Sequence, residues 1–236
     1  MPHWFNEEIK KAGIKLDERK VGQFRRYYEM LVLWNERINL TAITDEEGVY
    51  EKHFYDSLMP TFFTPFNQVH RIADIGSGAG FPSIPIKIIF PHLQVVVVDS
   101  LKKRITFLEE LVKELGLDRV ELIHGRAEEV GRKPYYRESF PIVLARAVAR
   151  LNILLEFTLP FVEVGGYFIA MKGKSGEQEL KDSMNALKVL RGKVDKIEKG
   201  TLPIEKSERI LLWIKKEGSI PDKYPRNGGK IEKKPL

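Results

Sequence analysis

The chain of 236 residues contains no cysteine and no long apolar run. The absence of cysteine excludes disulfides, thiolate metal sites and a cysteine nucleophile. No segment approaches the ~18 apolar residues that cross a bilayer, and the N-terminus, Met1–Glu8, lacks the pattern of a signal peptide. These absences fit a cytoplasmic protein without a membrane partner. Hydrophobic residues still make up 43% of the chain, which is enough for a sizeable core.

Basic residues outnumber acidic ones, and the excess is uneven. The net charge is +6, and the segment Lys215–Leu236 alone holds seven basic and three acidic residues. A basic tail of this kind indicates a polyanionic partner such as nucleic acid. The alternative is a solvated tail that only aids solubility.

The first 65 residues have the pattern of helices. A short helix is expected over 6–12, a longer one from the capping residue Asp17 to about Arg37, and another over 53–63. Thr44 or Asp45 is placed to cap a short helix between the last two. This part is predicted to be an N-terminal helical extension, residues 1–65.

From Arg71 onward, strand-like runs alternate with helical ones. The predicted strands are 72–75, 95–98, 120–123, 142–144 and 167–170, and the predicted helices are 84–90, 101–115, 151–157 and 178–190. The continuous apolar run Val95–Val98 is typical of a strand buried on both faces of a parallel sheet. Two further strands, 192–199 and 209–215, are expected to form a hairpin, so one of them runs antiparallel. The pattern predicts a doubly wound α/β domain over 66–218, followed by an irregular basic tail, 219–236, packed on or near the active site.

A glycine-rich turn follows the first predicted strand. Its sequence, from Asp74 to Pro82, has glycines at alternate positions, with Phe81 where the dinucleotide fingerprint requires its third glycine. The pattern Asp-x-Gly-x-Gly-x-Gly resembles that of class I S-adenosylmethionine-dependent methyltransferases. A Rossmann-like, mostly parallel seven-stranded sheet with one antiparallel strand is therefore expected. Asp99, at the end of the second strand, is placed to accept hydrogen bonds from the ribose hydroxyls.

The loop after the third predicted strand is expected beside the adenine of this cofactor. There the main chain of Ala127 and the side chain of Glu128 are placed to read the base edge. The alternative is that Glu128 caps or begins a short helix.

Two features that the sequence lacks reduce the kinds of atom that this chain is expected to methylate. The fourth strand lacks the Asn/Asp-Pro-Pro-aromatic motif of enzymes that methylate exocyclic amines, and methylation of base carbon by covalent attack needs a cysteine. A ring nitrogen such as guanine N7 has a free lone pair and needs positioning rather than a general base. Arg146 is placed to donate to guanine O6 or to orient the cofactor. Its alternative role is a structural ion pair with Asp74 or Glu128.

An ordered set of short segments resembles the bacterial guanine-N7 methyltransferases of small-subunit ribosomal RNA, also called glucose-inhibited division protein B. The segments cover nearly the whole chain: 34–35, 39–43, His53 with 56–58, 80–82 with 84–85, 99–100 with 103–104, 125–128, 146–147, 172–173, 224–226 and 234–236. The resemblance implies a cytoplasmic enzyme that transfers methyl from S-adenosylmethionine to N7 of one guanine in a decoding-region loop of 16S rRNA. Its partner would be that RNA or a small ribosomal subunit particle, and a monomer is expected.

The glycine motif and the resemblance together imply a set of site residues. Cofactor contacts are expected from Asp74, Gly76, Ser77, Gly78, Gly80, Phe81, Asp99, Ser100, Ala127, Glu128 and Arg146. Arg146 is also the catalytic positioning residue, and no metal is expected. Phosphate contacts are expected from Lys172, Arg226, Lys230 and Lys234. The residues Asn39, His53 and Asp56 either line the acceptor pocket or form a buried hydrogen-bond network.

The tail departs from the family pattern at two positions. Ile231 stands where the family usually has proline, and Asn227 stands where a basic residue is common. Two alternative functions stay open at this point: an RNA-binding or ribosome-assembly factor that keeps a cofactor fold without turnover, and a methyltransferase for small molecules or proteins.

Overall fold

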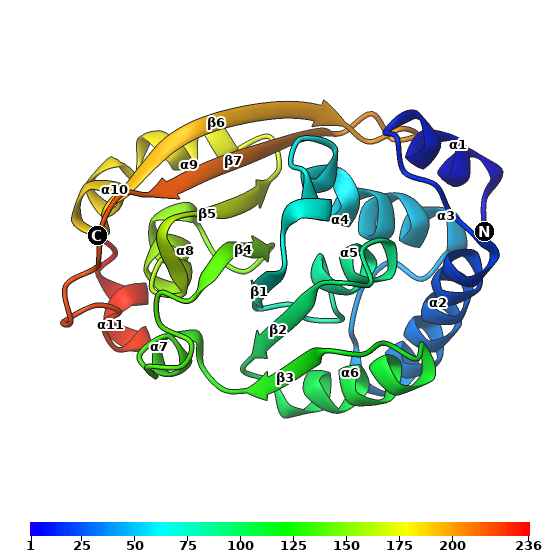
Figure 1. The fold of residues 1–236 in the computed structure, drawn as a ribbon, viewed down its shortest axis with the longest axis horizontal. Coiled ribbons are helices and arrows are strands. Elements are labelled where there is room, and N and C mark those ends of the chain that lie inside the picture. The colour runs from blue at the N-terminus through cyan, green and yellow to red at the C-terminus, as the bar shows by residue number, and fades with distance from the viewer.

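A computed structural model describes all 236 residues and contains one seven-stranded sheet (Figure 1). The strands are β1 Arg71–Ile75, β2 Gln94–Asp99, β3 Val120–His124, β4 Phe140–Arg146, β5 Val162–Lys172, β6 Gly192–Thr201 and β7 Glu208–Lys216. Their order is β3-β2-β1-β4-β5-β7-β6, with β1 to β5 parallel and β7 antiparallel to both neighbours. The predicted fold class, including the C-terminal hairpin, is confirmed.

The strand order reverses between β1 and β4. These two parallel strands are adjacent, with Asp74 opposite Leu144. The carboxyl ends of parallel strands meet at one edge of a sheet, and a reversal of strand order leaves a crevice there. The glycine turn after β1 and Arg146 at the end of β4 therefore lie at the same edge.

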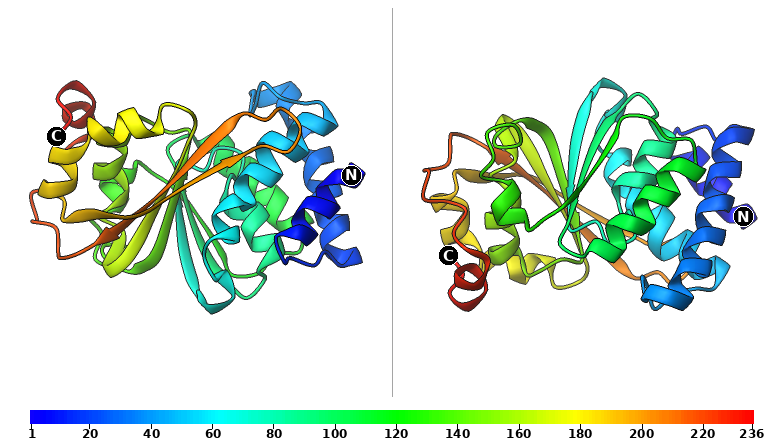
Figure 2. Two further views of the ribbon diagram at one scale, coloured as in Figure 1. Left: turned by 90° about the horizontal axis from the view of Figure 1, so that it is seen from above. Right: turned by 90° about the horizontal axis from the view of Figure 1, so that it is seen from below.

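Helices cover both faces of the sheet, and each face has its own core (Figure 2). On one face, α1 (His3–Lys11) and α2 (Glu18–Ile38) pack with α5 (Ser83–Ile89) and α6 (Lys102–Glu114). The other face carries α7 (Ala127–Val130), α8 (Leu151–Thr158), α9 (Gly176–Lys181) and α10 (Met184–Val189). β2 lies between these layers and is almost fully buried, as its unbroken valine run predicts. None of the helices is both long and apolar enough to span a membrane.

The helix predicted over 53–63 begins earlier and is irregular. It runs without a break through α3 (Glu46–Val49), a π-helical turn η1 (Tyr50–Tyr55), α4 (Asp56–Leu58) and a 3₁₀ turn η2 (Met59–Phe62). Asp45 caps it, since its side chain accepts a hydrogen bond from the amide of Gly48 at 2.7 Å. π-Helical turns occur often at functional sites, because they change the face on which side chains emerge. Here the π-turn carries His53 and leads directly into Asp56.

The helix predicted over 178–190 is two helices, α9 and α10. The break falls at Ser183, which is buried and whose hydroxyl donates to the carbonyl of Glu179 at 2.6 Å. Serine competes with the backbone for such hydrogen bonds, which weakens a helix interior. The remaining segment, η3 (Phe66–Gln68), is a single 3₁₀ turn before β1.

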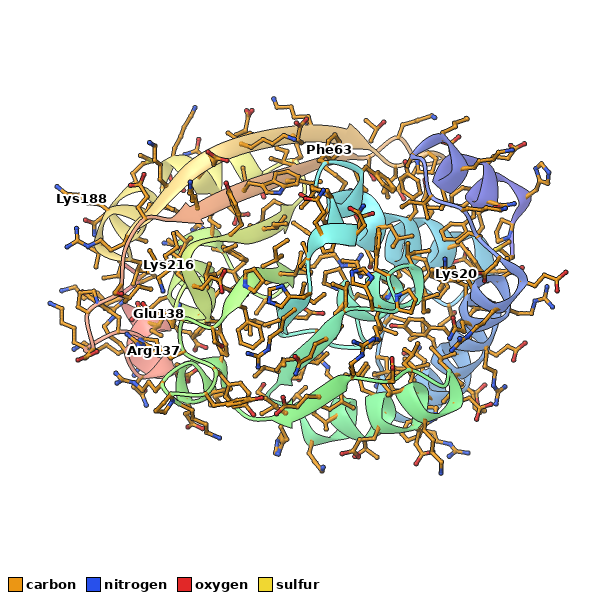
Figure 3. All side chains as sticks on the ribbon, viewed as in Figure 1. Lys20, Phe63, Arg137, Glu138, Lys188 and Lys216 are labelled. Atoms are coloured by element: carbon orange, nitrogen blue, oxygen red, sulfur yellow. The ribbon has the colours of Figure 1, made fainter.

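The tail is more ordered than predicted. It contains a short helix, α11 (Gly228–Lys233), which Asn227 caps by accepting from the amide of Gly229 at 3.1 Å. Ile231 is fully buried, and the burial of its side chain helps to hold the helix in place. One end of the sheet, close to where the tail begins, carries the side chains of Arg137, Glu138 and Lys216 (Figure 3). Arg137 donates to main-chain carbonyls of the tail, so a segment without strong periodicity is fixed by hydrogen bonds.

Candidate active site

The glycine turn after β1 is held against β2. The amide of Gly76 donates to the carbonyl of Val98 at 2.8 Å, and the amide of Gly78 donates to the carboxylate of Asp99 at 2.9 Å. Gly76 has φ +75°, and a Cβ there would lie 2.6 Å from a methyl of Val148. Glycine is therefore required at this position, both for the backbone angle and for the close approach of the loop after β4.

A cavity of about 340 Å³ opens beside this turn. Of the predicted cofactor residues, Gly76, Ser100, Ala127 and Glu128 line it. The full lining is Ile75, Gly76, Val98, Ser100, Gly125, Arg126, Ala127, Glu128, Val148, Ala149, Ile153, Phe157 and Glu232. Seven of the thirteen lining residues are hydrophobic, and the charged ones are Arg126, Glu128 and Glu232. We call this the cofactor cavity. Glu128 lies in the first turn of α7, as one of its two alternatives had it, and it also lines the cavity, while its contact with the adenine stays a prediction.

The two predicted aspartates stand behind the wall of the cofactor cavity. Asp74 is fully buried: one carboxylate oxygen accepts from the amide of Ser83 at 3.1 Å, and the other has no partner. Burial raises the pKa of Asp74. Asp99 is 2% exposed and accepts from the amides of Gly78 and Leu101 and, at 3.4 Å, from Arg104. Ser100 lines the cavity, as expected, whereas the Asp99 carboxylate accepts hydrogen bonds from the turn and is not part of the lining.

The other residues of the glycine motif pack rather than line. Ser77 is 3% exposed, with its hydroxyl 3.5 Å from that of Ser83. A Cβ on Gly80 would lie 2.6 Å from the hydroxyl oxygen of Tyr27, so this glycine makes room for α2. The cradle at Gly76 and the mixed lining of the cavity together fit a nucleoside-containing ligand with a polar tail, as S-adenosylmethionine is.

A second, larger cavity of about 700 Å³ lies across the loop after β4. Val148 and Ala149 line both cavities and form the wall that they share. Five basic side chains and two carboxylates line the second one. Its residues are Ile43, Lys52, His53, Asp56, Arg146, Ala147, Val148, Ala149, Arg150, Met171, Lys172, Gly173, Glu179 and Arg209. We call it the acceptor cavity, and its positive excess suits an anionic ligand.

Arg146 is held in this cavity by Asp56. One guanidinium nitrogen of Arg146 donates to the Asp56 carboxylate at 2.6 Å and to the carbonyl of Lys52 at 2.9 Å. The other Asp56 oxygen accepts from Arg209 at 2.8 Å. The structural partner of Arg146 is thus Asp56, and the predicted pairing with Asp74 or Glu128 is wrong. The N-terminal helices, β4 and β7 meet at this carboxylate, which no local pattern in the sequence indicates.

A stack of aromatic rings lies behind Arg146. The rings of His53 and Phe81 are 4.6 Å apart and nearly parallel, and Phe81 stacks on Tyr27 at 5.5 Å. The Arg146 guanidinium carbon lies 5.1 Å from the Phe81 ring centre, a cation–π distance. Phe81 and Arg146, both expected to contact the cofactor, therefore border the acceptor side. His53 and Asp56 both line this cavity and belong to one hydrogen-bond network with Arg146, and their role as an acceptor pocket stays a prediction.

Asn39 does not belong to this network. It is exposed and ends α2 in the left-handed conformation, with φ 48°. Two residues later, the hydroxyl of Thr41 lies 2.8 Å from Nε2 of His53. Asn39 thus turns the chain, and Thr41, which the sequence analysis missed as a site residue, makes the contact.

His53 is neutral at physiological pH. Burial, followed by the charge of Arg146, lowers its pKa from 6.5 to about 3. The unfolded chain binds a proton at this residue below pH 6.5, whereas the folded chain does not until about pH 3. The stability that neutral His53 contributes is therefore present above pH 6.5 and is lost as the pH falls.

Replacing His53 with glutamine should remove this acid sensitivity. The wild-type free energy of unfolding, relative to that of the variant, should fall by up to ~1.4 kcal/mol per pH unit below pH 6.5. Urea unfolding at pH 7.5, 6 and 5 measures the difference. His3→Gln, at an exposed position, is the matched control. A difference between wild type and His53→Gln that stays constant over this range would contradict the prediction.

The residues expected to contact phosphate are placed very differently. Lys172 lines the acceptor cavity, but its ammonium pairs with Glu179 at 2.8 Å and donates to the carbonyl of Ala149 at 2.7 Å. Arg226 pairs with the fully buried Glu156 through several hydrogen bonds of 2.7 to 3.1 Å. Because the Arg226 guanidinium already pairs with a buried carboxylate of the same chain, this geometry does not support the expected phosphate contact. Lys230 and Lys234 are exposed on the tail.

Several charged residues that line the two cavities were not predicted, and Lys52, Arg209 and Glu232 are examples. Lys52 and Arg209 lie in the acceptor cavity, and Glu232 lies in the cofactor cavity. Arg209 and Glu232 come from the last strand and the tail, far along the chain from the glycine motif. Charged residues at such positions are usually solvated, and the sequence contains no signal that distinguishes these.

Comparison with known proteins identifies the family of this chain. The family model described as rRNA small subunit methyltransferase G matches residues 20–208. The chain is 53% identical to the "Ribosomal RNA small subunit methyltransferase G" of Geobacillus sp. (strain WCH70), with 98% of both chains covered, and 52% identical to that of Geobacillus kaustophilus over the same shares.

Solved structures show the same fold at low identity. TYW2 of M. jannaschii in complex with AdoMet matches with a TM-score of 0.56, 14% identity, 74% of this chain and 79% of that one. A SAM-dependent methyltransferase from Aquifex aeolicus matches with a TM-score of 0.51, 15% identity and 72% and 93% coverage. The full-length identity to the curated relatives and the family match lead to one conclusion: this chain belongs to the rRNA small subunit methyltransferase G family.

Proposed function

We propose that this chain transfers a methyl group from S-adenosylmethionine to N7 of a guanine in 16S ribosomal RNA. The observation that carries the proposal is the pair of cavities on either side of Val148–Ala149. One is suited to a nucleoside-containing ligand, and the other is lined by an excess of basic side chains. Family membership supports the same reaction. We further propose that the protein acts as a monomer in the cytoplasm, on 16S rRNA or a small ribosomal subunit particle.

The three parts of the chain have separate tasks in this proposal. Residues 66–218 hold the cofactor through Gly76, Ser100, the main chain of Ala127 and the Glu128 side chain. Residues 1–65 complete the acceptor cavity through His53 and Asp56. Residues 219–236 contribute Glu232 to the lining of the cofactor cavity and present Lys230 and Lys234 to the RNA.

The reaction needs orientation and no proton transfer. S-adenosylmethionine supplies a methyl group bonded to a positively charged sulfur. The N7 lone pair forms the new bond to carbon as the carbon–sulfur bond breaks, and sulfur keeps that electron pair. Arg146, fixed by Asp56, is placed to donate to guanine O6 and so hold N7 in line. Pairing with Asp56 also offsets its charge, which limits repulsion of the cationic product base.

Methyl transfer is tested with labelled S-adenosylmethionine. The protein is incubated separately with small ribosomal subunits, free 16S rRNA, a protein mixture and a metabolite mixture, and the modified nucleotide is mapped. We expect label at N7 of one guanine. Label found only in the metabolite or the protein sample would mean that the substrate is a small molecule or a protein and not RNA. No transfer in any sample would favour an RNA-binding or assembly role without turnover.

The tail lysines should contribute to RNA affinity through charge. Replacing Lys230 and Lys234 together with glutamine should reduce the slope of log affinity against log salt by roughly 1 to 2, since each phosphate contact contributes about 0.7 to 0.9. Filter binding of 16S rRNA at several salt concentrations measures the slope. The control changes the exposed Lys10 and Lys15, in and shortly after α1, a helix that lies at the opposite end of the molecule from α11 (Figure 1). Equal slopes for the wild type and the tail variant would assign these lysines to solvent.

A further inference from the structure

The C-terminal segment reaches the cofactor cavity. Glu232, on α11, lines it together with Gly125–Glu128 from the loop after β3. α11 lies beside α7 and α8 in the ribbon (Figure 1), and it contacts α8. A residue near the C-terminal end of the sequence, far along the chain from Gly76, thus supplies part of the same cavity wall.

The position of this segment is firmly set. Glu156, fully buried on α8, accepts from the main-chain amide of Arg226 at 2.7 Å and from its guanidinium at 2.7 to 3.1 Å. Ile153 and Phe157, on the same helix, line the cofactor cavity. Arg132 donates to the carbonyl of Pro225 at 2.5 Å. The tail and one cavity wall are therefore anchored to the same helix.

The tail also packs directly on Glu128. A side chain at Gly228 would overlap the Glu128 carboxylate, so the main chain of the tail approaches that group as closely as glycine permits. Glu128 accepts from Arg126 at 3.0 Å. The pKa of Arg126 is raised mainly by Glu128 and more weakly by Glu232. Glu232 therefore lies on the same side of the cavity as Arg126 and Glu128.

Near Arg126, the carboxylates of the cavity lining outnumber the basic side chains, so carboxylate oxygens remain that can accept hydrogen bonds from a ligand. Glu128 and Glu232 are two carboxylates, and Arg126 is the one basic side chain of the cavity lining. A carboxylate accepts several hydrogen bonds, and an adenine presents an exocyclic amine as donor. In doubly wound sheets the ribose lies near the end of β2, where Ser100 is, and the base extends toward the next strand outward, β3. Glu232 is therefore on the adenine side.

We propose that Glu232 is a ligand of the adenine group of S-adenosylmethionine, and that the C-terminal segment is a structural part of the cofactor site. This rests on the methyl donor of the proposed function and is independent of the RNA acceptor. It assigns a function to a part of the chain that lies beyond the doubly wound domain.

Binding measurements on the full chain test this proposal. By isothermal titration calorimetry, Glu232→Ala should weaken binding of S-adenosylmethionine and of 5′-methylthioadenosine by the same factor, about tenfold, the usual size for a hydrogen bond to a charged group. Equal losses are expected because both ligands carry the adenine. Glu232→Gln keeps an acceptor oxygen and should recover part of the loss. Glu129→Ala, an equal charge change on an exposed neighbour outside the lining, should bind like wild type.

Hydrogen exchange gives a second readout. The amides of Gly228–Lys233 should exchange more slowly when 5′-methylthioadenosine is added. Unchanged exchange, or Glu232→Ala affinities within twofold of wild type, would overturn the role of Glu232. Failure of the wild type to bind S-adenosylmethionine would instead refute the methyl donor. Failure to methylate RNA with cofactor binding intact would leave the present proposal standing.

Discussion

Replacing Arg146 with alanine should lower the single-turnover rate of rRNA methylation by about 100-fold or more. One preorganised donor at a reacting group contributes a factor of this size, and orientation is the main requirement for attack by a ring nitrogen. Arg146 lines the acceptor cavity and not the cofactor cavity. The affinity for S-adenosylmethionine should therefore stay within about threefold of wild type, because the lost contact is at the acceptor. Rapid-quench turnover and calorimetric cofactor binding measure the two effects separately.

Arg150 offers a matched control for this experiment. It lies in the same cavity lining, but its side chain is 65% exposed and pairs with Asp182 at the surface. Arg150→Ala removes one positive charge near the RNA without touching the Asp56 network, so the turnover rate should change only a few-fold. An Arg146→Ala protein that turns over at the wild-type rate would make Arg146 a purely structural residue. If Arg146→Ala instead lost its affinity for S-adenosylmethionine, Arg146 would be a residue of the cofactor site.

Replacing Asp56 with alanine should cost about 3 to 5 kcal/mol of folding free energy. Asp56 is 5% exposed, and its two oxygens pair with Arg146 at 2.6 Å and Arg209 at 2.8 Å. Without it, two partly buried guanidinium groups face each other with no carboxylate between them. The melting temperature should fall by roughly 10 °C, since 1 kcal/mol shifts a domain of this size by about 2 to 4 °C. Calorimetry and urea unfolding at pH 7.5 check both values.

An exposed ion pair next to this network provides the comparison. Lys52 pairs with Glu205, and both side chains are at least one-third exposed. Glu205→Ala should cost less than about 1 kcal/mol, because solvent screens the pair. A loss of that small size for Asp56→Ala would mean that the two arginines find other partners. In that case Asp56 would not be what holds Arg146 for catalysis.

The fold followed largely from local patterns. The glycine turn, the valine run of β2 and the alternation of strands and helices each depend on near neighbours, and each was predicted. Irregularities and breaks within the predicted helices were not predicted from these local patterns. The π-turn at Tyr50–Tyr55 interrupts a segment whose pattern predicts a regular helix, and at Ser183 the side-chain hydroxyl competes for a backbone carbonyl. α11 is too short to be stable alone, and the burial of Ile231 helps to hold it in place.

The site was predicted in part, and the division has a physical basis. Residues next to the glycine turn, such as Gly76 and Ser100, lie in the cofactor cavity because chain connectivity puts them there. Asp99 was assigned to the cavity from its place after β2, yet its carboxylate holds the amides of the turn. A side chain at a strand end can point toward the ligand or toward the turn, and the strand pattern alone does not distinguish these directions.

The sequence by itself determined the sheet, the glycine turn, the kind of ligand that fits beside it and the absence of cysteine chemistry. These properties depend on residue type and on spacing over a few positions. Tertiary structure decided which charges meet. It brought Asp56, Arg146 and Arg209 together from three distant parts of the chain, and it placed Glu232 in the cofactor cavity. An ion pair between segments so far apart depends on how those segments pack, and packing is a property of the whole fold.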